Sequence, residues 1–236
     1  HGLAPWTDLA GLDAPFMSEF GLQALPDAAT VAEMFPTGAP GSLSDPRWGA
    51  RKAQIEKLRH YAGPDAGPST GSGPGLAAAI AATQRAQAAA LQVGIESCRL
   101  RRETLSGCAA RREDPLTAET QRTRRSSLRF LRPPRLCGEH PRCGGVAFWQ
   151  LNEPWPAVSW SVIDRAGRPK AAYEMLRRAY QPILIAARFP WRRYAAADVF
   201  SAEVWLVNDG PEAWQGCRAE ALLDNVVVWT AADVSL

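Results

Sequence analysis

The spacing of apolar and polar residues predicts several helices. The clearest covers residues 76–103, an Ala-rich stretch that only Gly94 interrupts and that turns basic towards its C-terminal end, as the helix dipole favours. Amphipathic patterns predict shorter helices over 51–61 and 170–180. An Asp at the N-cap position predicts another helix over 27–34. Helical segments therefore account for much of the chain before residue 181.

Short apolar runs predict strands in two different settings. Residues 16–25 and 145–151 look like buried strands, and Glu19 is the lone carboxylate of the first run, as at the end of a barrel strand. Beyond Pro182 the pattern changes to short strands separated by turn sequences, which is typical of a β-sandwich. We therefore place a boundary near residue 182. The strands predicted after it cover 183–188, 202–207, 217–223 and 226–230.

Residues 104–142 differ from the rest of the chain. Arg recurs throughout and no hydrophobic period persists, which indicates either a loosely ordered insertion or a stretch translated in the wrong frame. Cys137, His140 and Cys143 suggest a metal site, but the two cysteines are too far apart for a paired-Cys zinc knuckle and a fourth ligand is lacking. We therefore predict no metal and no other cofactor.

Composition limits the classes of function. A 46% apolar content allows a sizeable core, and the net charge of +3 does not require an anionic partner. Binding of a polyanion through the Arg-rich tract is an alternative, but nucleic acid is not the expected partner. No run approaches the roughly 20 apolar residues of a membrane span, and no signal peptide is visible in the sequence, so we expect a cytoplasmic protein away from membranes, although an upstream part is expected to be missing. Five cysteines, an odd number, indicate reduced thiols, and the oligomeric state stays open.

Two motifs carry a resemblance to a known family. The first is FMSEFGLQALP, residues 16–26, and the second is WQLNEPWP, residues 149–156, which continues through Ser159, Trp160 and Lys170. Both resemble the β-mannosidase branch of glycoside hydrolase family 2. In that family the first motif is the nucleophile strand, and the second is the last barrel strand with its following loop.

The resemblance implies an α/β fold followed by an all-β one. Residues 1–181 would be the C-terminal part of a (β/α)8 barrel, and residues 182–236 an immunoglobulin-like β-sandwich. In such barrels the active site lies at the C-terminal ends of the strands. The chain starts at His1, so we expect an upstream part to be missing and the sequence to be a C-terminal fragment.

The resemblance also implies a chemistry. Retaining glycosidases use two carboxyl groups about 5 Å apart, one as nucleophile and one as acid/base. The motif makes Glu19 the nucleophile, whereas the sequence pattern alone also allows an ion-paired carboxylate. Glu153 follows Glu19, but the acid/base strand of the family precedes the nucleophile strand, so the acid/base is expected upstream of this chain. Glu153 is interpreted either as a loop residue that contacts the sugar or as an acid that fixes the loop.

The remaining predicted site residues are sugar contacts. Trp149 and Trp155 offer flat apolar faces that match a pyranose ring, although each also suits barrel packing, and Asn152 offers hydrogen bonds to hydroxyls. The predicted activity is that of a retaining exo-β-glycosidase, most closely a β-mannosidase acting on a β-mannoside or related oligosaccharide. Exo-β-glucosaminidase, β-galactosidase or β-glucuronidase activity, or sugar binding without catalysis, are the alternatives. The 236 residues alone are expected to be inactive.

Overall fold

The structure is a computed structural model. It describes residues 3–11, 14–51, 53–63, 75–103, 129–131, 143–190, 192, 194–195 and 198–236. Most of the Arg-rich tract at 104–142 lies outside these residues, and so do Cys137 and His140. Contacts divide the chain into two units. The first comprises His1–Arg99 with His140–Tyr180, and the second comprises Leu100–Glu139 with Gln181–Leu236.

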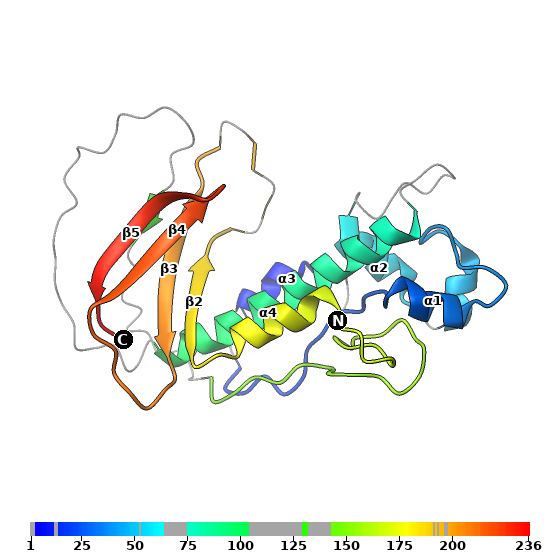
Figure 1. Ribbon diagram of the computed structural model, residues 1–236, viewed down its shortest axis with the longest axis horizontal. Coiled ribbons are helices and arrows are strands. Elements are labelled where there is room, and N and C mark those ends of the chain that lie inside the picture. The colour runs from blue at the N-terminus through cyan, green and yellow to red at the C-terminus, as the bar shows by residue number, and fades with distance from the viewer. Residues whose placement is uncertain are drawn as a thin grey trace. The chain divides into compact units, whose positions relative to one another are not determined.

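Helices dominate the first unit (Figure 1). Asp27 caps one of them, since its side chain accepts a hydrogen bond from the backbone N–H of Ala29 at 2.8 Å, which confirms the predicted N-cap. The amphipathic helix predicted from residue 51 begins four residues later, because the preceding residues form a 3-10 turn. The helical elements are η1 (Trp6–Gly11), α1 (Ala28–Met34), η2 (Pro46–Arg51), α2 (Ile55–Ala62), α3 (Leu76–Glu103) and α4 (Ala171–Ala179).

A buried apolar cluster joins α3 to α4, which lie side by side in Figure 1. Each helix contributes the apolar face that its sequence pattern predicts, and removing these faces from water stabilises the pair. The same cluster includes two residues of the first motif, Met17 and Phe20. The motif that carries Glu19 therefore rests on the core of this unit. The helical members of the cluster are Leu91, Ile95, Cys98, Ala172, Leu176 and Ala179.

The two apolar runs of the first unit are paired but do not form regular strands, so the prediction of strands at 16–25 and 145–151 is wrong in that respect. Isolated parallel pairing joins Met17 to Val146, and the Met17 carbonyl accepts a hydrogen bond from Ala147 at 2.8 Å. Further along, the Phe20 carbonyl accepts one from Trp149 at 2.8 Å. The pairing slips by one residue between these two bonds, and the slip interrupts the ladder.

The second unit contains the described strands. β2 (Ile183–Arg188) pairs antiparallel with β3 (Ser201–Asn208), and β3 pairs parallel with β1 (Arg129–Leu131). β4 (Cys217–Leu223) and β5 (Val226–Val234) form a separate two-stranded sheet. The bounds predicted for β2 and β4 are confirmed, whereas β3 and β5 are longer than predicted.

The turn between β4 and β5 is the predicted one. Asp224 and Asn225 have φ angles of 49° and 64°, which are the left-handed conformations of a two-residue hairpin turn. Asn and Asp tolerate these conformations better than other residues with side chains, so the local sequence sets the strand register. None of the helices that the structure describes is long and apolar enough to span a membrane.

Candidate active site

A pocket of about 410 Å³ in the first unit is lined by the exposed side chain of Glu19. It lies where the first motif meets η1, α2 and α3. Glu19 forms no hydrogen bond or ion pair with any residue that the structure describes. The lining residues are Ala4, Pro5, Trp6, Asp8, Leu9, Met17, Glu19, Phe20, Gly21, Leu22, Gln23, Gln54, Lys57, Leu58, Tyr61, Ala90 and Trp160.

Close backbone packing places the first motif against the second. A Cβ atom on Gly21 would lie 2.1 Å from the carbonyl oxygen of Trp149, a distance at which backbone would have to move. A Cβ atom on Gly94 of α3 would lie 2.3 Å from the Phe20 ring. Glycine at both positions therefore lets the segment that carries Glu19 approach the Trp149 backbone and α3 closely.

Apart from Glu19 and Gln23, the polar residues of the pocket come from outside the two motifs. Tyr61 of α2 donates a hydrogen bond to the carbonyl of Ala4 at 2.8 Å, and burial and the negative charge of Asp8 raise the pKa of its phenol. Lys57 is half-buried on the same helix. Gln23 of the first motif accepts a hydrogen bond on its side-chain oxygen from the backbone N–H of Gln54 at 2.9 Å.

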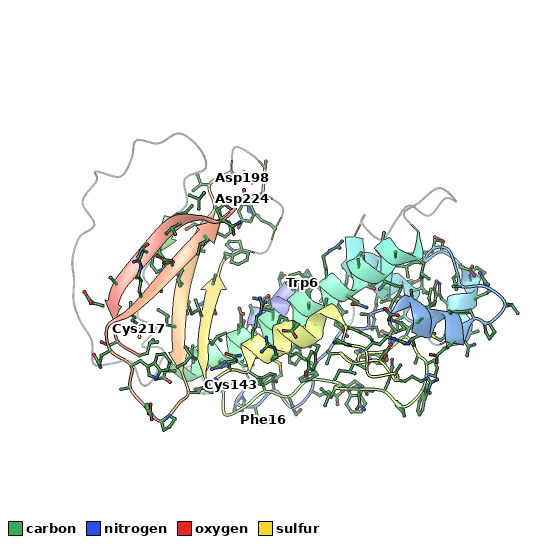
Figure 2. All side chains as sticks on the ribbon, in the orientation of Figure 1. Trp6, Phe16, Cys143, Asp198, Cys217 and Asp224 are labelled. Atoms are coloured by element: carbon green, nitrogen blue, oxygen red, sulfur yellow. The ribbon has the colours of Figure 1, made fainter. Side chains whose placement is uncertain are left out.

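Two tryptophans that were not among the predicted sugar contacts also line the pocket. Trp6 belongs to η1 and is labelled in Figure 2. Trp160 follows the second motif, and its Cδ1 atom would lie 3.2 Å from a Cβ on Gly21. Its backbone is held in place because the Gln87 amide donates to the Trp160 carbonyl at 3.0 Å. The second motif extends through Trp160, whereas Trp6 lies in neither motif and is recognised only from its position after folding.

The predicted sugar contacts lie outside the pocket lining. The backbone of Trp149 adjoins Phe20, but its side chain is 48% exposed, and that of Trp155 is 65% exposed. Asn152 is also exposed. The structure thus brings the two motif backbones together without directing these three side chains into the pocket that Glu19 lines.

Glu153 is buried, with 4% of its surface exposed. Burial raises the pKa of its carboxyl, whereas the Ser159 hydroxyl and the Lys170 ammonium lower it. Neither carboxylate oxygen accepts a hydrogen bond of ordinary geometry from the residues that the structure describes. Of the two roles predicted for Glu153, this position favours that of an acid that fixes the loop.

The charge of Glu153 acts on a lysine, Lys170, that is almost fully enclosed. Burial lowers the pKa of Lys170 to about 8, and the negative charge of Glu153 opposes that shift. The Lys170 ammonium donates to the Ala24 carbonyl at 3.3 Å and to the Ser161 hydroxyl at 3.2 Å. These bonds tie the end of the first motif to the segment that carries Trp160.

A second carboxylate, that of Asp164, adds hydrogen bonds between the segment after Trp160 and α1. The Thr30 hydroxyl of α1 donates to one oxygen of Asp164 at 2.5 Å. The backbone N–H groups of Ala166 and Arg168 donate to the other oxygen, both at 2.9 Å. Burial raises the pKa of Asp164, but these hydrogen bonds outweigh it and lower the pKa overall. Asp164 thereby fixes the loop after Trp160 onto α1.

No group of three or more His, Cys, Asp or Glu residues with metal-binding geometry occurs among the described residues. Of the three residues weighed for zinc, only Cys143 is described, and it is a buried free thiol whose Sγ lies 3.2 Å from the Gly145 carbonyl. Figure 2 labels this residue together with Phe16.

Comparisons with known proteins give a partial sequence match and a wider match in fold. No family model matches the chain. Beta-mannosidase B of Aspergillus niger is 41% identical over 51 residues, which are 22% of this chain and 6% of that protein. The β-D-mannosidase of Dictyoglomus thermophilum matches the whole chain with a TM-score of 0.60 and 20% identity. The exo-chitosanase of Amycolatopsis orientalis matches 93% of the chain with a TM-score of 0.55 and 17% identity.

The chain spans a small share of these proteins. It covers 24% of the D. thermophilum enzyme and 22% of the exo-chitosanase. The structural likenesses, at such low identity, concern the fold.

Proposed function

Because the chain is a β-mannosidase-like portion of glycoside hydrolase family 2, we propose that the protein to which it belongs is a retaining exo-β-glycosidase that removes terminal β-D-mannosyl residues. On this proposal residues 1–181 supply the C-terminal part of a (β/α)8 barrel. Residues 182–236 supply strands of an immunoglobulin-like sandwich. The likeness in fold to the D. thermophilum enzyme over the whole chain supports both assignments.

The proposed mechanism has two steps that Glu19 shares with an acid/base from outside these 236 residues. The Glu19 carboxylate attacks the anomeric carbon while the acid protonates the departing oxygen, which forms a glycosyl-enzyme. The same acid/base then removes a proton from water, and the water displaces Glu19 with restoration of the β configuration. A nucleophile must be ionised and accessible, and Glu19 is accessible.

One observation carries the assignment of Glu19. Its carboxylate lines a pocket, without a partner among the described residues, at the place where the two motif backbones are hydrogen-bonded to each other. The ion-paired role that the sequence pattern also allows has no support among those residues. Within the proposal, the exposed Trp149, Trp155 and Asn152 contact sugar units of the substrate, and Trp160 stacks on the sugar in the pocket.

Another sugar specificity is the second candidate. The likeness to the exo-chitosanase, which extends over 93% of the chain, favours a glucosaminide ahead of a galactoside or a glucuronide as the substrate if it is not a mannoside. Sugar binding without hydrolysis is what the pocket would provide if no acid/base faced Glu19.

Kinetics with the full-length protein and with the 236-residue chain test the proposal. We expect the full-length protein to hydrolyse an aryl β-mannoside and to release β-mannose first, which NMR detects before mutarotation. The 236-residue chain is expected to give no turnover above the uncatalysed rate, because it lacks the acid/base. Release of α-mannose, or turnover by the 236-residue chain, would contradict the mechanism.

A further inference from the structure

One face of α2 forms a wall of the pocket that Glu19 lines. Gln54, Lys57, Leu58 and Tyr61 all line it, and their spacing of three, four and seven residues places them on one side of a helix. Leu58 is buried and anchors this face in the core, whereas the other three bring polar groups to the pocket. The helix therefore presents a polar surface to whatever occupies the pocket.

Lys57 is the member of this face whose charge is unmatched. It is half-buried, and it forms no hydrogen bond or ion pair with any residue that the structure describes, although Asp8 and Glu19 line the same pocket. An ammonium offers three N–H donors and no acceptor, and partial removal from water costs free energy unless those donors are satisfied. A ligand with oxygen acceptors would satisfy them.

Three charged residues line the pocket. Asp8 and Glu19 supply two negative charges, and Lys57 supplies one positive charge. Without Lys57 the pocket would attract a cationic amino sugar more strongly. With Lys57 in place, an amino sugar meets a like charge, and like charges in a pocket oppose binding.

We propose that Lys57 is a specificity-determining residue, whose ammonium donates a hydrogen bond to a hydroxyl oxygen of a neutral hexoside and disfavours an amino sugar in the same place. This inference rests on the proposed function and names the substrate class of the same pocket: neutral hexosides rather than glucosaminides. Lys57 binds the sugar, and it takes no part in bond breaking.

The test measures the kcat/KM values of the full-length protein for an aryl β-mannoside and an aryl β-glucosaminide. Assays run at about pH 6, below the usual pKa of an α-amino group, so that the amino sugar is charged. We expect Lys57→Gln to lower the mannoside-to-glucosaminide ratio about tenfold and Lys57→Glu to lower it further. Lys57→Arg keeps the charge and is expected to keep the preference for mannoside.

Arg59→Gln is the matched control. It removes the same charge from the same helix, but Arg59 is exposed and donates to the Leu43 carbonyl rather than lining the pocket. An unchanged ratio in Arg59→Gln, with a lowered ratio in Lys57→Gln, supports a local role. Equal ratios in the wild type, Lys57→Gln and Lys57→Glu overturn the inference, while mannoside turnover by the wild type leaves the proposed function standing.

Binding measurements separate the role of Lys57 from the proposed hydrolytic function. If the wild type hydrolyses neither glycoside, the proposed function fails, and binding of methyl β-mannoside and methyl β-glucosaminide measured by NMR titration still tests Lys57. A preference for mannoside that Lys57→Gln weakens supports the inference in that case. Absence of any effect of Lys57→Gln on either affinity overturns it.

Discussion

Replacing Glu19 with Ala in the full-length protein is expected to lower kcat for an aryl β-mannoside by at least about 10⁴-fold, since removal of a nucleophile leaves only the contributions of binding and charge stabilisation. The fold should be unaffected, because the exposed Glu19 side chain makes no hydrogen bond or ion pair with the described residues. Stopped or continuous assays of nitrophenol release give kcat, and circular dichroism confirms folding.

Azide is expected to restore part of the activity of Glu19→Ala. Azide fits the space left by the carboxylate and attacks the anomeric carbon from the same side, forming a C–N bond as the C–O bond to nitrophenolate breaks. The product is α-mannosyl azide, whose inverted configuration NMR identifies. Glu56→Ala removes an exposed carboxylate of α2 that does not line the pocket, and it should retain full activity. Near-normal kcat in Glu19→Ala would contradict the assignment.

Replacing Gly21 with Ala is expected to lower the free energy of unfolding by about 3 kcal/mol, since the new Cβ would meet the Trp149 carbonyl oxygen at 2.1 Å. Backbone on the opposing segment cannot rotate away, so the two motifs would have to separate. The same change should also reduce kcat by displacing Glu19. Denaturant unfolding of the full-length protein, together with the aryl β-mannoside assay, measures both effects.

Substitutions at two other glycines provide comparisons for the expected effect of Gly21→Ala on stability. Gly94→Ala places its Cβ 2.3 Å from the Phe20 ring, which is able to shift, and Ala suits a helix better than Gly, so we expect a smaller loss of about 1 kcal/mol. Gly41→Ala is the control, because nothing lies within 4 Å of its Cβ and its stability should change by less than about 0.5 kcal/mol. Equal stability of the Gly21→Ala and Gly41→Ala proteins would show that the close approach does not matter.

The elements that the sequence predicted best are those with local signals. The short apolar run of β2 and the Asp224–Asn225 turn before β5 act over a few positions, and the structure follows them. The N-cap of α1 is equally local. In the first unit, by contrast, the paired segments around Met17 and Val146 depend on each other across more than a hundred residues, so no local pattern reveals the slip in their pairing.

The residues of the candidate site also fall into two groups: those that a sequence motif marks and those that only tertiary packing brings to the pocket. The two motifs pointed to Glu19 and to the segment beside it, and the structure pairs those backbones. The wall made by Lys57 and Tyr61 comes from a helix whose sequence reads as an ordinary amphipathic one, and Trp6 comes from a short 3-10 helix. Their place in the pocket follows from tertiary packing, which composition and spacing do not encode.

The motif around Glu153 does not by itself define the role of this residue. Its sequence, Asn-Glu-Pro, is compatible with a catalytic carboxylate, a sugar contact or a structural acid. Its burial favours the last of these, since only 4% of Glu153 is exposed and its negative charge interacts with the enclosed Lys170 ammonium. Sequence order argues against the acid/base role, and burial favours the structural one.

The central claim is that Glu19 forms a covalent bond to the sugar, and trapping that bond tests it most directly. The full-length protein is incubated with 2-deoxy-2-fluoro-β-mannosyl fluoride, whose fluorine at C2 slows hydrolysis of the glycosyl-enzyme by destabilising the positively charged transition state. Digestion and tandem mass spectrometry then locate the label. We predict a single fluoromannosyl ester on Glu19. A label on Asp8, Glu153 or any other carboxylate, or no label on a protein that hydrolyses the aryl mannoside, would contradict the claim.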